Sequence, residues 1–351
     1  MDFCFWINVR GMQMKEALVD VSVLLVFFTR HEQFEQVFEQ VRKARPRRLF
    51  LYQDGPRAGR NDDIVNIKKC REIAENIDWN CEVHRLYQNE NHGCDPSGYI
   101  AQTWAFSQTD KCIVIEDDDI PSVSFFHYCK ELLDYYENDT RIMLITGLNT
   151  DGITEYCPND YFFSSTTFTV GCWASWSRVI SEWDEQYSAL SDSYIQKLVE
   201  EKIKRKKLAS DFLTSCCNHR QSGIQHFETI MILNQYVNSG LTIIPKKNMV
   251  LNIGLTDEAT HTSSELDTLP KGYRQLFMLE TYDISDNLIH PKYVIEDYSY
   301  KDRSYKMYGW NNNFTKIYRT LESFMYKIFK GQGHKAVKEL LTKVKKVVRR
   351  I

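Results

Sequence analysis

The stretch CIVIEDDDIPSVSFF, residues 112–126, joins a run of β-branched apolar residues to four consecutive acids and then to an aromatic segment. A short apolar run of this kind is typical of a strand that is buried on both faces. Glu116, Asp117, Asp118 and Asp119 stand where that strand ends. Four adjacent carboxylates repel one another, so their position needs a physical explanation.

The same alternation of apolar runs and amphipathic stretches extends over the first 150 residues. Strand, helix and strand in this order predict an α/β fold with a mostly parallel sheet and helices on both faces. In such sheets ligands bind at the carboxyl ends of the strands, which is where the four acids lie. The predicted strands are 21–28, 48–54, 81–87, 112–116 and 142–147, and the predicted helices are 32–44, 63–77, 98–108 and 125–138.

Two interpretations of the acids are open. A hard divalent ion with oxygen ligands, Mg²⁺ or Mn²⁺, would neutralise the cluster. Alternatively, the acids cap the amino end of the helix that begins near Pro121, where carboxylates are favourable. One acid is enough for a cap, so four in a row favour the metal site, with Asp119 alone as the cap.

Composition limits the class of protein. A chain of 351 residues with 43% apolar residues can bury a large core in one domain or two coupled ones, and a net charge of −3 gives no sign of a nucleic-acid partner. Ten cysteines without a CxxC pair favour a reducing, cytoplasmic compartment. We expect neither a secretory signal nor a membrane span. The absence of GxxxxGK[ST] and GxGxxG argues against a P-loop and a dinucleotide fingerprint.

Four segments, in order, resemble the GT-A glycosyltransferases. VIEDDDIPSVSFFHYCKELL is similar to the Asp-x-Asp-type region of this fold, most closely the Glu-Asp-Asp motif of enzymes similar to N-acetylglucosaminyltransferase I. FFTRHE (27–32) and LYQDG (51–55) resemble the ends of that family's first two strands. GLTIIPKKNMVLNIGLTDEATHT (240–262) resembles the closing segment of bacterial capsule and lipopolysaccharide glycosyltransferases.

The resemblance implies a site for a nucleotide sugar. Asp118 would bind a divalent ion that bridges the two phosphates, and Glu116 and Asp117 would lie on the donor side, with Asp117 facing the ribose or a metal-bound water. Arg30 would pair with the diphosphate, for which a guanidinium is well suited; the competing interpretation is a surface arginine. Asp54 would accept a hydrogen bond from uracil, which implies UDP, although an Asp-Gly turn explains it equally well.

The resemblance also implies inversion at the anomeric carbon, which needs a carboxylate as general base. The corresponding segment is QHFETIMILNQ (225–235), whose only acid is Glu228. An unshifted alignment places the base on Thr229, and a shift of one residue places it on Glu228. Glu228 is therefore the first candidate and Asp211 the reserve, while the competing role of Glu228 is to pair with a buried arginine.

Two further residues match functional positions of the family. His261, in DEATHT, corresponds to a late histidine that completes the metal or phosphate site, although a lone histidine is as often structural. Trp173, in VGCWASWSR, corresponds to the aromatic floor of the acceptor site and could stack on a sugar ring. A single tryptophan more commonly belongs to the core.

The chain is expected to divide into four parts: an amino-terminal extension (1–20), a nucleotide-sugar-binding half (21–150), an acceptor and catalytic half of the same domain (151–265), and a carboxyl-terminal helical extension (266–351). The last of these ends in GHKAVKELLTKVKKVVRRI, a predicted basic amphipathic helix. Such a helix can lie on an anionic bilayer or dock on the protein with its lysines in solvent. The first possibility predicts a peripheral protein on the inner face of the cell membrane.

Together these features predict an inverting, metal-dependent glycosyltransferase for bacterial surface polysaccharide, which moves a hexosyl or N-acetylhexosaminyl group from a UDP-sugar to a saccharide or lipid-linked acceptor. Two alternatives remain open. A metal-dependent nucleotidyltransferase or other phosphotransfer enzyme could use the same acids, although it should carry a glycine-rich or basic loop early in the chain. A non-catalytic carbohydrate-binding protein would need neither Arg30 nor Asp54.

Overall fold

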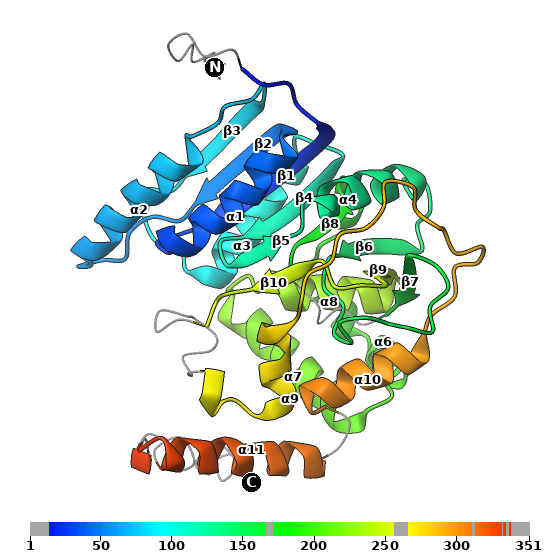
Figure 1. Ribbon diagram of the computed structural model, residues 1–351. Coiled ribbons are helices and arrows are strands. Elements are labelled where there is room, and N and C mark those ends of the chain that lie inside the picture. Colours follow the sequence, from blue (N-terminus) through cyan, green and yellow to red (C-terminus); the bar gives the residue numbers. More distant parts are fainter. Residues whose placement is uncertain are drawn as a thin grey trace.

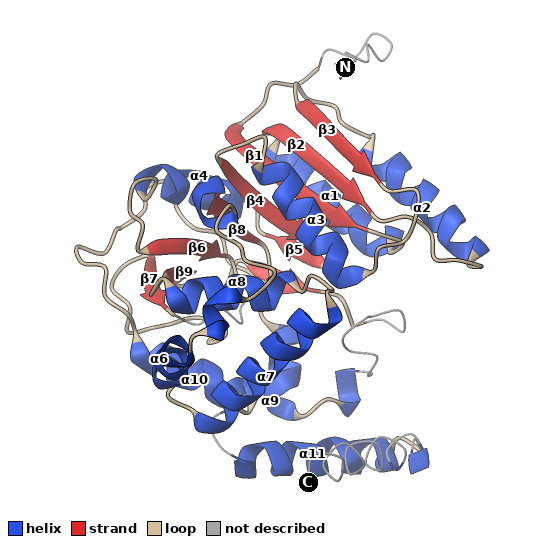
Figure 2. Cartoon of the chain, turned by 180° about the vertical axis from the view of Figure 1, so that it is seen from behind, coloured by secondary structure: helices blue, strands red, loops and turns tan. Residues whose placement is uncertain are grey.

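The computed structural model describes residues 14–165, 171–255, 266–310, 313–331, 333–334 and 337. An eight-stranded sheet runs through it in the order β3-β2-β1-β4-β8-β6-β9-β7, with helices packed around it (Figures 1 and 2). The strands are β1 (Val19–Phe27), β2 (Pro46–Gln53), β3 (Glu82–Tyr87), β4 (Lys111–Glu116), β5 (Asp119–Pro121), β6 (Ile142–Thr146), β7 (Tyr161–Ser164), β8 (Trp173–Trp176), β9 (Leu241–Pro245) and β10 (Val250–Asn252). The main helices are α1 (His31–Ala44), α2 (Asn61–Ala74), α3 (Cys94–Phe106), α4 (Ser124–Tyr135), α5 (Ser177–Ile180), α6 (Ser193–Ile203), α7 (Lys206–Ser222), α8 (Phe227–Val237), α9 (Lys271–Arg274), α10 (Tyr298–Tyr308) and α11 (Asn313–Phe329).

The first half of the sheet is parallel, as the sequence predicts. β1 pairs with β2 on one side and β4 on the other, and β2 pairs with β3. At the centre, Leu24 lies between Phe50 and Val114, and all three side chains are buried. This is why these strands have continuous apolar runs rather than alternating ones. All three parallel pairs end at the edge of the sheet where Glu116 lies.

The second half of the sheet is mixed. β8 runs antiparallel between β4 and β6, β9 is parallel to β6, and β7 is antiparallel to β9. Four of the seven strand pairs are therefore parallel, and the sheet is mostly rather than wholly parallel. The antiparallel β8 brings residues 173–176 into the centre of the sheet.

Helices cover the sheet in two groups. α1 and α2 contact each other, whereas α3 contacts β1, α5 and α8. Right-handed crossovers between parallel strands account for this division, because the chain crosses the sheet in one direction from β1 to β3 and returns from β3 to β4. The amino ends of α1 and α3 consequently lie near the carboxyl ends of the strands that precede them.

A second, two-stranded sheet lies beside the acids. β5 pairs antiparallel with β10, so that Asp119 is opposite Asn252. The ribbon is continued by a backbone hydrogen bond of 2.8 Å from the Ile253 amide to the Asp118 carbonyl oxygen. The segment that follows the acids is thus fixed by a partner more than 130 residues later in the chain, as the separation of Asp119 and Asn252 shows.

Part of the carboxyl-terminal extension is built into the domain. Tyr300 of α10 is fully buried against Phe162, and its hydroxyl group accepts hydrogen bonds from the Thr150 amide and hydroxyl. Arg303 pairs with Asp151 at 2.7 Å. Residues 298–308 therefore complete the packing of the sheet. No helix in the described part of the chain is both long and apolar enough to span a membrane.

Candidate functional site

The four acids lie at the junction of β4, a turn and β5. Glu116 is the last residue of β4 and is half-buried, while Asp117, Asp118 and Asp119 are each at most 9% exposed. Carboxylate oxygens of Glu116, Asp118 and Asp119 all lie within 4.8 Å of one another. The predicted cluster at the carboxyl edge of the sheet is therefore present, with these three side chains as its converging members.

Arg30 comes from the end of β1 and reaches the same place. Its Nη1 donates to Asp118 Oδ2 at 2.7 Å, and its Nη2 donates to Asp117 Oδ1. Asp117 also accepts the Phe28 amide at 3.1 Å. Burial alone would lower the pKa of Arg30, but the charges and hydrogen bonds of Asp117 and Asp118 outweigh it and raise the pKa. Arg30 is therefore a fixed cation of the site and not a surface arginine.

The interpretation of Asp119 as a helix cap is wrong. α4 begins at Ser124, and Asp119 lies in β5, where its Oδ1 accepts a hydrogen bond of 2.9 Å from Asn252 Nδ2. The pairing of β5 with β10 turns this side chain toward the cluster rather than toward the helix. Asp119 consequently joins Glu116 and Asp118 as a possible metal ligand, a role the sequence did not indicate.

Burial and mutual repulsion disfavour negative charge at this site. Burial raises the pKa of Glu116 well above its usual value, and the charges of Asp118, Asp119, Glu228 and Asp117 raise it further. Burial, followed by the charge of Asp118, also raises the pKa of Asp119, although the hydrogen bond from Asn252 opposes this effect. Burial raises the pKa of Asp117 to about 6 despite the nearby Arg30. A further cation would stabilise the charged forms.

The cluster fits a hard divalent ion. Carboxylate oxygens are the ligands that Mg²⁺ and Mn²⁺ prefer, and three of them converge here. Gly254 leaves space at the site, because a Cβ atom at this position would overlap the Asp118 carboxylate. Its amide donates to Asn252 Oδ1 at 3.0 Å, so the same asparagine holds both Asp119 and this glycine. The donor set and the space beside it agree with the predicted metal site.

Asp54 has a structural role in this fold. It follows β2 and is 5% exposed, and its oxygens accept hydrogen bonds from the amides of Gly55, His92 and Gly93 and from Asn91 Nδ2, at 2.8–3.2 Å. This carboxylate ties the segment after β2 to the loop before α3. The structure thus gives Asp54 a local structural role, and its role in recognising uracil stays a prediction.

The two candidate bases lie in different surroundings. Glu228 is in the first turn of α8, half-buried, and its charge is among those that raise the pKa of Glu116. Asp211 is on α7 and pairs with Lys207 at 2.7 Å, with 36% of its side chain exposed. Thr229 Oγ1 is engaged with Tyr187 and His219. Of the two candidate carboxylates, Glu228 is the one whose charge contributes to the raised pKa of Glu116.

Sequence reasoning missed a histidine pair beside Glu228. His226 Nδ1 lies 3.2 Å from Asp95 Oδ2, in the first turn of α3. The rings of His226 and His219 stack with centroids 3.6 Å apart, and burial followed by the charge of His226 lowers the pKa of His219. The sequence does show two histidines around the α7–α8 connection. Their position near Asp95 depends on the packing of α3 against α8, which the sequence alone does not reveal.

Trp173 belongs to the core. It is the first residue of β8, is 1% exposed, and stacks on Phe106 with centroids 6.5 Å apart. The core interpretation therefore accounts for it, and the acceptor-floor interpretation does not, since neither face of the indole is open to a sugar. His261 and the basic residues from 338 onward lie outside the described residues.

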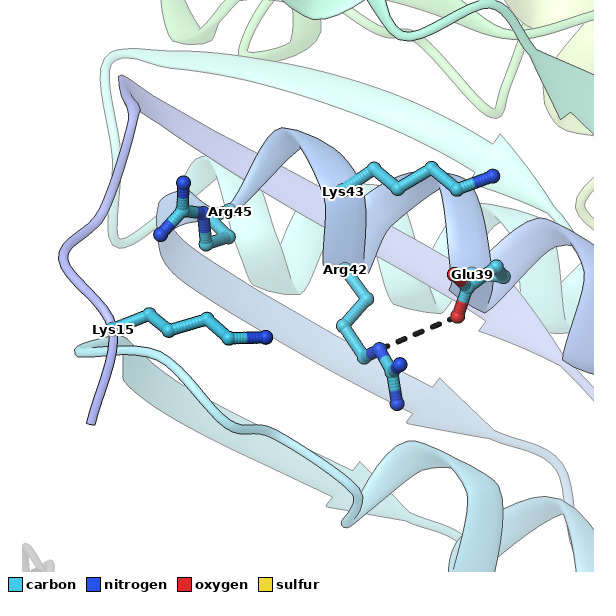
Figure 3. Close-up of a pocket in the computed structure, with 5 residues that line it drawn as sticks. All are labelled: Lys15, Glu39, Arg42, Lys43 and Arg45. Carbon is cyan, nitrogen blue, oxygen red and sulfur yellow. Dashed lines mark ion pairs between the residues drawn. The ribbon is translucent and has the colours of Figure 1, made fainter. Parts of the chain in front are cut away.

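A basic depression lies at the far end of α1 from Arg30. Lys15, Arg42, Lys43 and Arg45 line it together with Glu39, which pairs with Arg42 at 3.3 Å (Figure 3). A helix of 14 residues is about 20 Å long, so this surface is remote from the acidic cluster at the amino end of α1.

Neither a comparison with known protein-family models nor a search of curated proteins finds a match for this sequence. Any functional assignment therefore rests on the residues and their geometry. The strongest feature is the position of Glu116, Asp118 and Asp119 at the carboxyl end of β4, next to Arg30 from the end of β1.

Proposed function

We propose that this protein is an inverting, metal-dependent glycosyltransferase of the GT-A type. It would transfer a sugar from a nucleotide sugar, expected to be a UDP-sugar, to a saccharide or lipid-linked saccharide of the kind used in bacterial surface polysaccharides. The observation that carries the proposal is the convergence of three carboxylates with a half-buried guanidinium at the edge where a parallel sheet binds its ligands.

Glu116, Asp118 and Asp119 would hold Mg²⁺ or Mn²⁺. When bound, such an ion supplies positive charge that stabilises the diphosphate as it leaves the sugar. The remaining acid, Asp117, has another task, because it binds both the Phe28 amide and Arg30. Asp118 also accepts a hydrogen bond from Arg30, so this acid would lie between the ion and the guanidinium.

Arg30 would contact the diphosphate without leaving the site. A guanidinium has five N–H donors, and two of those on Arg30 are directed to Asp117 and Asp118. The others are available for phosphate oxygens, with the two aspartates fixing the plane of the guanidinium. A positively charged, preorganised fork next to the metal ligands suits a diphosphate better than it suits a neutral sugar.

Glu228 would act as the base. In a single displacement the acceptor hydroxyl attacks the anomeric carbon, its proton passes to a Glu228 carboxylate oxygen, and the bond from that carbon to the diphosphate breaks. Three features support Glu228: its place in the first turn of α8, its partial burial, and its electrostatic effect on Glu116. His226 precedes Glu228 by two residues and pairs with Asp95 of α3, and both would line the same side of the site.

A thermal-shift screen of nucleotide sugars with and without Mn²⁺, followed by a hydrolysis and transfer assay on the stabilising compound, tests the proposal. We expect stabilisation by a UDP-sugar that requires Mn²⁺, together with slow metal-dependent release of UDP. Binding of saccharides without nucleotide or metal would favour a carbohydrate-binding protein. Release of inorganic diphosphate from a nucleoside triphosphate would favour a nucleotidyltransferase.

A further inference from the structure

Helix α11 lies along the outside of the molecule, separated from the main sheet by the elements around α7, α9 and α10 (Figures 1 and 2). It has 17 residues and is therefore about 25 Å long. It contacts the short 3₁₀ helix Leu266–Thr268, the carboxyl end of α10 and Arg274 of α9. The face of α11 that makes these contacts is the polar one.

The inner face of α11 is polar. Ser323 Oγ donates to the Thr268 carbonyl oxygen at 2.9 Å, and Arg319 Nη2 donates to the Lys306 carbonyl oxygen at 3.0 Å. Just beyond the helix, Lys330 pairs with Asp267 at 2.7 Å. Tyr326 lies under the Arg274 guanidinium, and even Lys327 is only 6% exposed. Hydrogen bonds, an ion pair just beyond the helix and a cation–π contact therefore attach this face to the domain.

The outer face of α11 is apolar. At 100° per residue, the seven large apolar side chains of α11 that are exposed fall within an arc of about 120°, on the side opposite Ser323. Phe314 is 84% exposed and Phe329 is 79% exposed, and the other five of these residues are 43–66% exposed. We call this row the outer stripe of α11; its members are Phe314, Ile317, Tyr318, Leu321, Met325, Ile328 and Phe329.

This arrangement is the reverse of an ordinary surface helix, which buries its apolar face and exposes its polar one. Single exposed apolar residues are common on soluble proteins and need no explanation. A continuous row of seven on one helix is different, because such patches are typical of surfaces that are covered by a partner or a membrane. The question is what covers the outer stripe.

Charge points to an anionic lipid surface. In the sequence, residues 331–351 directly after α11 carry seven basic residues and one acid, Glu339. Those bases are Lys335, Lys338, Lys343, Lys345, Lys346, Arg349 and Arg350. A second copy could cover the outer stripe but would carry the same basic segment, and so would supply no opposite charge to it. An anionic bilayer instead attracts the basic segment and accepts the apolar stripe.

We propose that α11 lies flat on the surface of an anionic bilayer with its outer stripe in the acyl boundary. The aromatic residues Phe314, Tyr318 and Phe329 suit the interface, where aromatic side chains are favoured. The polar inner face stays attached to the domain, so binding needs no rearrangement of the fold. This inference does not depend on the proposed enzymatic function.

The test uses the full chain and co-sedimentation with vesicles of phosphatidylglycerol and phosphatidylcholine, compared with phosphatidylcholine alone. The variants are Leu321→Asp and Met325→Asp, both at the centre of the outer stripe. The matched control is Leu198→Asp, which places the same charge at an exposed leucine of α6, 40% exposed, in another part of the molecule. Size and thermal stability of each protein are measured without vesicles.

We expect the wild type and Leu198→Asp to bind the mixed vesicles, and both α11 variants to bind them at least about tenfold more weakly with an unchanged thermal transition. If the α11 variants bind as well as the wild type, the proposal is overturned, and the basic segment alone would account for vesicle binding. Loss of a wild-type dimer in the variants would identify a second copy as the occupant. A lowered thermal transition would show that the stripe is covered by the chain itself.

Discussion

Replacing Glu116 by Gln should make the metal-free protein more stable and the metal-bound protein less stable. The carboxylate oxygens of the cluster lie within 4.8 Å of one another, and two charges at that limit repel by about 3 kcal/mol at an effective dielectric constant of about 20. Glu116 faces two such neighbours, Asp118 and Asp119, and Arg30 offsets part of the repulsion. Glutamine keeps the shape and removes the charge, so we expect a gain of about 1–3 kcal/mol.

The gain should depend on pH in a defined direction. The folded-state pKa of Glu116 is raised above its usual value of about 4.5, so between these two pKa values the folded chain holds a proton that the unfolded chain has released. The contribution of Glu116 to stability therefore falls as the pH rises through this window. Glutamine does not titrate, so the variant does not lose stability in this window. Its gain in unfolding free energy over the wild type should therefore disappear near pH 4.5 and be largest at alkaline pH.

The assay is thermal unfolding in EDTA and in saturating Mn²⁺. For a chain of 351 residues 1 kcal/mol corresponds to roughly 1 to 2 °C, so the variant should melt a few degrees higher in EDTA. Mn²⁺ at 1,000 times its dissociation constant should add about 4.1 kcal/mol to the wild type and much less to the variant, which reverses their order. Glu200→Gln on α6 serves as the charge-matched control. A variant that melts lower in EDTA, or that keeps the full Mn²⁺ gain, would refute the account of the cluster.

Three other substitutions test the remaining roles. Asp118→Asn removes a converging carboxylate and should abolish Mn²⁺-dependent UDP binding by calorimetry, with loss of transfer. Glu228→Gln should keep donor affinity and lose turnover by about two to four powers of ten, and the same loss in Asp211→Asn instead would move the base to α7. Asp54→Asn should lower the unfolding free energy by about 2 kcal/mol in the absence of nucleotide, because the Asp54 carboxylate accepts hydrogen bonds from backbone amides. An unchanged melting temperature would contradict this structural role and favour a role in ligand binding alone.

The parallel half of the sheet is predictable from the sequence because its signals are local. The strand expected at 112–116 is β4 at Lys111–Glu116, and the one expected at 21–28 is β1 at Val19–Phe27. These strands are buried on both faces, so each is marked by an uninterrupted apolar run. The position of the acids at the end of β4 then follows from the alternation of strands and helices.

The partners of those acids are not predictable in the same way. Asp119 looks like a helix cap in its own segment, and only the pairing of β5 with β10 places it against Asn252 and in the cluster. β8 is four residues long and enters the sheet between β4 and β6, which makes Trp173 a core residue. Short strands carry too few residues for a period to be seen, and their pairing is decided by contacts distant in sequence.

The distribution of charge explains why one site contains both four acids and a half-buried arginine. With all four ionised, the acids contribute a charge of −4 and Arg30 contributes +1, which leaves −3 in a largely buried place. Arg30 is shared between Asp117 and Asp118, and Asp117 also accepts the Phe28 amide, so most of the uncompensated charge falls on the three acids of the cluster. Burying this charge costs stability unless a cation binds. A divalent ion would leave a net charge of about −1, and Arg30 prevents the cluster from being more repulsive before the ion arrives. The energetic cost of the empty site and its affinity for a metal thus have the same origin, and this is why a single charge-removing substitution should change them in opposite directions.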